Sequence, residues 1–192
     1  LLSEVEGTTY WKNDEFLENE YLQGTPDNIF NRVRDTKSNY EFDTFKKAEL
    51  TTLYSWQIKG YIWMAIGSGH KIERTGELCY CLINTPCHRI EAEIKSMWYS
   101  MGMPEIDEER WIKAASQLER NHIFDIAKFK EDYPKFDLYN SFCRDIPKHM
   151  RVKTFEVTLE DSDIEHMTRR SKMAKEWLLN REIQELELIN SK

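Results

Sequence analysis

The chain has 192 residues, of which 12% are aromatic and 32% charged. That length suits one domain, spanning residues 1–192, with a single core that buries about 70% of the surface of the unfolded chain. No apolar run approaches the roughly 20 residues that a membrane-spanning helix needs, and the cytoplasm is the expected compartment. The net charge of −7 argues against coating of nucleic acid by the whole surface, so a nucleic acid would have to be held by local basic patches and by bound metal.

The first twenty residues are expected to contribute little regular structure. Residues 1–13 look like the end of a helix followed by a loop, because a Gly-Thr-Thr run at residues 7–9 breaks a helix. The segment 15–20 is expected to add a short strand before the most informative part of the chain.

The segments 20–29 and 32–39 are short and bounded by turn-forming residues, which predicts a β-hairpin with Asn31 in its turn. Pairing about that turn brings Asp27 close to Asp35. Two carboxylates on neighbouring strands are a metal site in outline.

Side chains alternate along a strand, so Asp35 and Lys37 share one face and point together at whatever Asp27 faces. A hard cation such as Mg²⁺ takes oxygen ligands and keeps several waters, so Asp27, Asp35 and the backbone carbonyl of Thr36 could hold it with positions left open. A phosphate oxygen and a water would occupy those positions, and the Lys37 ammonium could orient the nucleophile or stabilise negative charge. The pattern therefore predicts cleavage of a phosphodiester.

Helices and one central strand are expected next. Residues 40–50 predict a short helix or lid, and residues 53–66 a longer helix that ends near a Gly-Ser-Gly run. Residues 77–84 are apolar on both strand faces, which indicates a central strand covered from both sides. Thr85 is expected to cap a helix over residues 86–101.

The remainder reads as mostly helical. A helix is expected to start near Asp107, with shorter pieces at 124–129 and 136–142, then a strand at 151–158 and a long helix from about Asp161. The order of elements predicts an α/β fold with a mixed central sheet flanked by helices and a mostly helical C-terminal part.

The helix over residues 53–66 also carries Gln57 and Tyr61, which stand four apart on one face. Together with the hairpin, the series Pro-Asp, Asp-x-Lys, Gln-x-x-x-Tyr resembles the PD-(D/E)xK nuclease superfamily. It is most similar to phage-type exonucleases of the YqaJ-like and lambda exonuclease branches. The resemblance covers residues about 7–100 and implies a restriction-endonuclease-like core.

By that resemblance, Asp27 and Asp35 match the metal-binding acids and Lys37 the catalytic lysine. Gln57 and Tyr61 match the helix motif that supports the site or contacts DNA. The family also places an acid, usually Glu, on a helix well upstream of the hairpin. By spacing that acid would precede residue 1, and the start at Leu rather than Met suggests that an N-terminal helix is missing.

Each motif alone is weak in a chain this rich in charge, and their order and spacing carry the interpretation. The alternative for residues 24–27 is an ordinary turn or strand edge, since proline cannot donate to a ladder.

Candidate basic patches are Arg32 with Arg34, Lys46 with Lys47, and residues 148–153, although each could be a solvated charged face. The four cysteines (Cys79, Cys81, Cys87 and Cys143) lack C-x-x-C spacing, so core thiols are favoured over an iron–sulfur cluster.

The sequence therefore predicts a metal-dependent DNA nuclease that uses Mg²⁺ or Mn²⁺, with an exonuclease of phage-type recombination or DNA end processing as the preferred form. The resemblance implies DNA as a partner, with a single-strand annealing protein and further copies of the chain as other candidates. The alternative is a catalytically inactive nuclease-like fold that binds DNA or protein. Polarity, strand preference and the choice between end-dependent and internal cleavage stay open.

Overall fold

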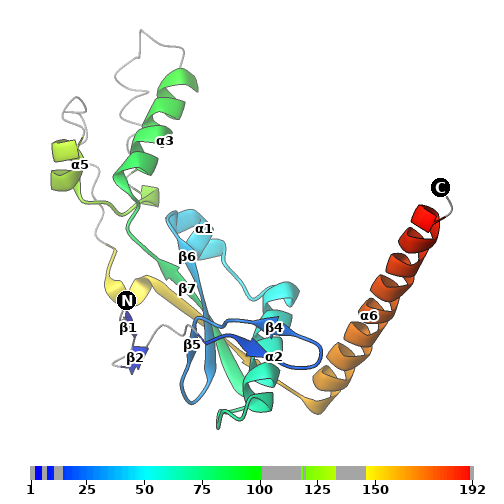
Figure 1. The fold of residues 1–192 in the computed structure, drawn as a ribbon. Helices are drawn as coiled ribbons and strands as arrows, with labels where there is room; N and C mark the ends of the chain where they lie inside the picture. The colour runs from blue at the N-terminus through cyan, green and yellow to red at the C-terminus, as the bar shows by residue number, and fades with distance from the viewer. Residues whose placement is uncertain are drawn as a thin grey trace. The chain divides into compact units, whose positions relative to one another are not determined.

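The computed structural model describes residues 3–5, 8–10, 15–100, 118, 120–132 and 146–190 (Figure 1). In chain order the described elements are β1 (Ser3–Val5), β2 (Thr8–Tyr10), β3 (Leu17–Glu18), β4 (Gln23–Gly24), β5 (Asn28–Ile29), β6 (Val33–Asn39), α1 (Phe42–Lys47), α2 (Thr52–Gly67), β7 (Thr75–Leu82), α3 (Cys87–Ser100), α5 (Ile126–Asp132), the 3₁₀ helix η2 (Lys148–Met150), β8 (Val152–Thr158) and α6 (Asp161–Asn190). None of these described helices is both long enough and apolar enough to cross a membrane.

The chain forms two compact units, each made of separate stretches. Unit 1 comprises Leu1–Thr36, Leu50–Cys79 and Thr154–Lys192, and unit 2 comprises Lys37–Glu49 and Tyr80–Lys153. The division falls within strands β6, β7 and β8. The expectation of a single domain over residues 1–192 stays a prediction.

Four described strands form a mixed sheet in the order β5-β6-β7-β8. Strands β5 and β6 are antiparallel. Glu73 N–H donates to the Asn31 carbonyl at 2.7 Å, and Ile83 N–H donates to the Asn39 carbonyl at 2.9 Å. Because the residue numbers increase in the same direction along both strands, β6 and β7 run parallel. Parallel neighbours need a crossover, and α2 supplies it. The predicted α/β fold with a mixed sheet flanked by helices is confirmed.

Strand β8 completes the sheet as the sequence predicted for residues 151–158. Its pairing with β7 is antiparallel, since Leu82 N–H donates to the Arg151 carbonyl and Leu159 N–H to the Arg74 carbonyl. Strand β7 is therefore a central strand, and its buried Leu78 and Cys79 lie on opposite faces. This confirms the expectation that it is covered on both sides.

Helix α2 begins and ends with recognisable signals. The Thr51 side chain accepts the N–H of Tyr54 at 3.3 Å, and at the other end Gly69 adopts a φ of +90° while its N–H donates to the Ile66 carbonyl. The predicted end of this helix at the Gly-Ser-Gly run is confirmed. Ile58 and Ile62 of this helix are fully buried, whereas Ile66 in its last turn is exposed.

The close packing of α2 on the sheet depends on Gly76 of β7. A Cβ atom at this position would lie 2.7 Å from Cγ2 of Ile58 and 3.0 Å from the carbonyl oxygen of Val33. Both distances are shorter than van der Waals contact, so the absent side chain lets the helix approach the strands.

The N-terminal expectation is wrong. Residues 3–5 and 8–10 pair as antiparallel strands, with Val5 opposite Thr8, where the sequence predicted the end of a helix followed by a loop. Valine, threonine and tyrosine are all residues that favour strands. The short strand expected within residues 15–20 is present as β3, which pairs with β4.

The predicted cap of α3 is also wrong. The first intrahelical carbonyl is that of Pro86, which accepts from Arg89 N–H at 3.0 Å, so Pro86 takes the capping position and the helix starts at Cys87. The Thr85 hydroxyl instead binds the Tyr40 carbonyl at 2.9 Å and Nδ1 of buried His122 at 3.0 Å. Thr85 therefore connects loops inside unit 2.

Three other expected helices have described counterparts. Helix α1 is shorter than the predicted 40–50, α5 lies slightly later than the predicted 124–129, and α6 begins at the predicted Asp161. The start of a helix near Asp107 and the piece at 136–142 lie outside the described residues.

Candidate active site

The hairpin places Asp27 directly across from Asp35. The register pairs Asn28 with Arg34 and Ile29 with Val33, and one further step along both strands sets Asp27 opposite Asp35. Side chains that oppose each other across an antiparallel pair lie on the same face. The two acids that the sequence singled out therefore share one face of the sheet edge.

A direct hydrogen bond fixes the Asp27 carboxylate beside β6. Its Oδ2 accepts the N–H of Thr36 at 2.6 Å, from a residue nine positions away in the chain. This bond also fixes the direction of the second carboxylate oxygen of Asp27, Oδ1. Asp27 as a whole is half-buried.

Pro26 explains why the Thr36 carbonyl suits a ligand role. If the register of Asn28 with Arg34 is continued by two residues, Pro26 falls opposite Thr36, and proline has no N–H to donate to that carbonyl. Within a strand, the N–H and C=O of one residue face the same neighbouring strand. Since the Thr36 N–H reaches Asp27, its carbonyl also turns toward the Pro26–Asp27 segment.

Asp35 is buried, with 4% of its surface exposed. A carboxylate in such a place is costly unless hydrogen-bond donors or a cation compensate its charge. Lys37 lies two residues further along β6, so alternation puts it on the same strand face, and it is half-buried.

The donor set fits a hard cation. Across the part of the chain that the structure describes, no cluster of three or more His, Cys, Asp or Glu side chains forms a metal site. Mg²⁺ needs fewer protein ligands than that, since it commonly binds through one or two carboxylates and completes its shell with waters and substrate phosphates. Asp27, Asp35 and the Thr36 carbonyl are oxygen donors of this kind.

Gln57 and Tyr61 are joined to each other and to the hairpin. Gln57 Nε2 donates to the Tyr61 hydroxyl at 3.1 Å. The Tyr61 ring lies against Gly24, where a Cβ atom would be only 2.9 Å from Cε1 of the ring. Gly24 precedes Asp27 by three residues, so the helix motif supports the segment that carries the first acid.

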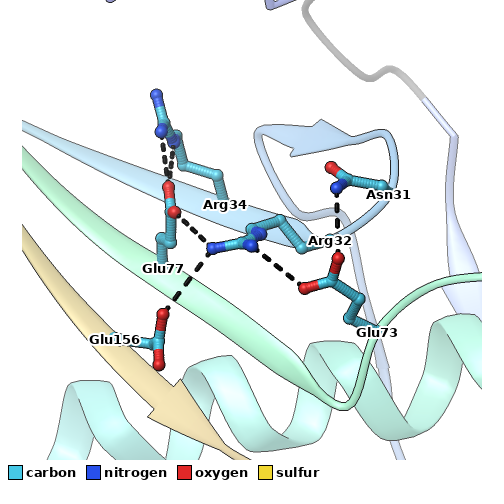
Figure 2. Close-up of polar contacts among 6 residues, drawn as sticks. All are labelled: Asn31, Arg32, Arg34, Glu73, Glu77 and Glu156. Carbon is cyan, nitrogen blue, oxygen red and sulfur yellow. Dashed lines mark hydrogen bonds and ion pairs between the residues drawn. The ribbon is translucent and has the colours of Figure 1, made fainter. Parts of the chain in front are cut away.

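The opposite face of the hairpin carries a network of ion pairs (Figure 2). Arg34, only 6% exposed, donates from Nε to Glu77 at 2.9 Å, and a second guanidinium nitrogen contacts the same carboxylate. Arg32 donates to Glu77 at 2.8 Å and to Glu73 at 3.0 Å, and lies 3.7 Å from Glu156.

The charge of these arginines is therefore balanced within unit 1. Burial alone would lower the pKa of Arg32, but the hydrogen bond to Glu77 and the charges of Glu73 and Glu77 outweigh it and raise that pKa. The structure thus uses Arg32 and Arg34, a candidate basic patch in the sequence, to tie the hairpin to β7.

The other candidate basic patches lie in unit 2. Lys46 and Lys47 are exposed in the last turn of α1, and Lys148 is exposed in η2. Lys153 has a structural role, because its Nζ donates to the carbonyls of Lys46 at 2.9 Å and Ala48 at 2.7 Å at the end of α1.

The described cysteines, Cys79, Cys81 and Cys87, are free thiols, and Cys143 lies outside the described residues. Burial, followed by the charge of Asp132, raises the pKa of Cys87, which disfavours the thiolate. Cys79 is buried in β7, as expected for a core thiol.

Sequence reasoning missed two contacts that build the site. The bond from Thr36 N–H to Asp27 could have been suspected from Pro26, which cannot pair with Thr36 in the ladder. The packing of Tyr61 on Gly24 could have been suspected from a glycine three residues before the acid.

The described fold is a mixed α/β sheet with an antiparallel hairpin at its edge and helix α2 as the crossover between β6 and β7. No protein-family model matches the chain. No curated protein matches it either. Among solved structures, the fold is similar to that of a phage-related exonuclease from Haemophilus somnus 129PT, with a TM-score of 0.54 and 18% sequence identity. The match covers 93% of this chain and 65% of that one, so the chain spans less than two thirds of that protein's length.

Proposed function

We propose that this protein is a metal-dependent DNA nuclease, with exonuclease as the preferred form. One line of reasoning carries the proposal: the β5–β6 register, continued by one residue, sets Asp27 opposite Asp35, and Thr36 N–H donates to Asp27 Oδ2 at 2.6 Å. Similarity to a phage-related exonuclease supports it, as does the Pro-Asp, Asp-x-Lys, Gln-x-x-x-Tyr series. We further propose the YqaJ-like or lambda exonuclease-like branch, and recombination or DNA end processing as the role.

In this proposal Asp27, Asp35 and the Thr36 carbonyl hold Mg²⁺ or Mn²⁺. The ion, when bound, supplies Lewis-acid polarisation of a phosphate oxygen and a coordinated water of lowered pKa. Asp27 and Asp35 would hold that ion beside the scissile phosphate, and the Lys37 ammonium would stabilise negative charge that develops on the phosphate oxygens. Water oxygen bonds to phosphorus while one bond from phosphorus to a sugar oxygen breaks, which leaves a phosphate monoester and a free hydroxyl.

Nuclease assays test the proposal directly. We expect degradation of linear duplex DNA with Mg²⁺ or Mn²⁺, no degradation with EDTA, and sparing of covalently closed circles if cleavage depends on ends. Asp27→Asn and Asp35→Asn should each lose at least about 100-fold in rate, because each removes a ligand charge. Glu18→Gln, which changes an exposed carboxyl group on β3, is the matched control and should cut like the wild type.

The second candidate function is a nuclease-like fold that only binds DNA or a protein. The observation that favours it is the absence of a third acidic ligand within the described residues. Calorimetric titration with Mn²⁺ separates the two, since a nuclease site should bind the ion and lose it in Asp35→Asn. A protein that binds no divalent ion and cuts no DNA would refute the nuclease proposal.

DNA is the proposed partner, with a single-strand annealing protein as a second candidate and the cytoplasm as the expected compartment. The exposed Lys46, Lys47 and Lys148 are candidates for phosphate contacts. If they serve that role, their replacement by Gln should weaken DNA binding uniformly across sequences and reduce its salt dependence.

A further inference from the structure

The tip of the β5–β6 hairpin is a tight turn made of Phe30, Asn31 and Arg32. Phe30 N–H donates to the Arg32 carbonyl at 3.2 Å across this turn. The Asn31 carbonyl accepts the N–H of Glu73 at 2.7 Å, and Asn31 Nδ2 donates to the Glu73 carboxylate at 3.2 Å. The Arg32 guanidinium binds Glu73 and Glu77 (Figure 2). Asn31 and Arg32 are therefore held against β7 and the segment that leads into it.

Phe30 is the residue that this turn presents to solvent, because 72% of its surface is exposed. Turn positions usually carry Gly, Pro, Asn, Asp or Ser, and a phenylalanine ring left in water contributes no burial to the core. The contacts of the two residues that follow it fix the backbone on which the ring stands. Little conformational freedom would therefore be lost when the ring binds a ligand.

Phe30 also lies close along the chain to the proposed metal site. It follows Asp27 by three residues, and three residues of extended chain span at most about 11 Å. Stacked nucleotides advance by about 3.4 Å along a DNA strand, so this distance corresponds to about three of them. If the proposed function is correct, the ring lies within reach of the bases beside the scissile phosphate.

We propose that the Phe30 ring stacks on one unpaired nucleobase of the DNA substrate, close to the point of cleavage. This inference rests on the proposed nuclease function and defines its substrate as a strand end with an unstacked base. Every base has an aromatic face, so the contact adds affinity without selecting a sequence. Stacking does not require attraction to phosphates, which suits a protein with a net charge of −7.

A nucleobase fits this ring better than a partner protein does. Sites for proteins are marked by contiguous apolar patches larger than a few hundred Å². Here the other residues of the turn, Asn31 and Arg32, are polar. One exposed aromatic ring in a polar turn matches the face of one base.

The affinity for short single-stranded DNA, measured by fluorescence anisotropy, tests the proposal. Measurements with Mn²⁺ in a Lys37→Ala background avoid cleavage, because this variant is expected to hold the ion without cutting. Phe30→Ala should bind about 5- to 150-fold more weakly, and Phe30→Trp should bind as tightly as the phenylalanine form. Phe30→Leu keeps an apolar side chain without an aromatic face and should lose affinity as Phe30→Ala does. Tyr99→Ala removes a ring that is 77% exposed on α3 and serves as the matched control, with no change expected.

Strands with one abasic site at successive positions then identify the stacked base. At the position whose base meets the ring, Phe30→Ala should cause no further loss of affinity, whereas elsewhere it should cause the full loss. Equal losses at every abasic position would overturn the proposal, as would a Phe30→Leu protein that retains full affinity. A wild type that cuts DNA while Phe30→Ala binds DNA normally would refute this inference alone. A wild type that cuts no DNA would refute the proposed function and this inference with it.

Discussion

Adding one methyl group at Gly24 should loosen the contact that joins helix α2 to the hairpin. A Cβ atom there would lie 2.9 Å from Cε1 of Tyr61, and ordinary contact begins near 3.4 Å, so the ring or the strand must move by about 0.5 Å. The obstructing atom belongs to a rigid ring, which cannot yield by rotating a flexible end. Overpacking of this kind costs about 1–3 kcal/mol.

That cost is measurable as a change in thermal unfolding. For a protein of 192 residues, each kcal/mol shifts the midpoint by about 2–4 °C, so Gly24→Ala should lower the midpoint by about 2–12 °C. Gly67→Ala is the matched control, because a Cβ atom at Gly67, the last residue of α2, meets nothing within 4 Å. It should be neutral or stabilising by up to about 1 kcal/mol.

A double-mutant cycle identifies the cause. If the Tyr61 ring is the obstruction, Gly24→Ala should cost less in a Tyr61→Ala background, with an interaction energy of about 1 kcal/mol or more. Strictly additive effects would refute the packing argument, as would a Gly24→Ala protein that unfolds with the wild type. If the proposed site is correct, Gly24→Ala should also weaken Mn²⁺ binding, because the segment that carries Asp27 shifts.

Three further predictions concern the sheet, the proposed chemistry and pH. Gly76→Ala should destabilise the fold by about 1–3 kcal/mol in chemical denaturation, since its Cβ atom would lie 2.7 Å from Ile58; an unchanged midpoint would contradict this. Lys37→Ala should abolish DNA cleavage while calorimetry shows little loss of Mn²⁺ affinity, and retained cleavage would place the catalytic charge elsewhere. Burial alone would raise the pKa of Asp163, but the hydrogen bonds from Lys59 and from the Glu160 N–H, together with the charges of Lys59 and His166, outweigh burial and lower that pKa. This carboxylate therefore stabilises the fold above the ordinary aspartate pKa, and that stability is lost as pH falls through the folded-state pKa. Unfolding curves of Asp163→Asn should therefore depend less on pH in the acidic range than those of the wild type, and equal slopes would refute the assignment.

The elements that the sequence predicted well are those with local signals. Helix α2 has a threonine cap and a Gly-Ser-Gly end, and β7 is apolar on both faces, so their existence and position follow from spacing and residue type. The antiparallel pairing of β5 with β6 was also accessible, because a hairpin register follows once the turn is placed at Asn31. The meeting of Asp27 with Asp35 at that hairpin stays a prediction.

The errors arise where a residue has a non-local partner. Thr85 has the residue type of a helix cap, but a hydroxyl can bind any acceptor in reach, and here it donates to the Tyr40 carbonyl and contacts His122 Nδ1. Arg32 and Arg34 read as a basic patch because the acids that balance them, such as Glu77, lie more than forty positions away in the chain. The spacing of apolar and charged residues along the sequence does not show which distant residues form ion pairs.

In the proposed function, the two faces of β6 have different roles, one structural and one in metal binding. On one face, Arg34 and Glu77 hold the strand to its neighbour and contribute almost no net charge. On the other face, Asp27 and Asp35 repel a phosphate, and the whole protein carries a net charge of −7. If the proposed function is correct, long-range attraction of DNA is weak, and the divalent ion must supply the positive charge at the point of cleavage. The affinity for DNA should then fall more on removal of the divalent ion than on addition of monovalent salt. For a protein that binds DNA through a basic surface, we would expect salt to have the larger effect.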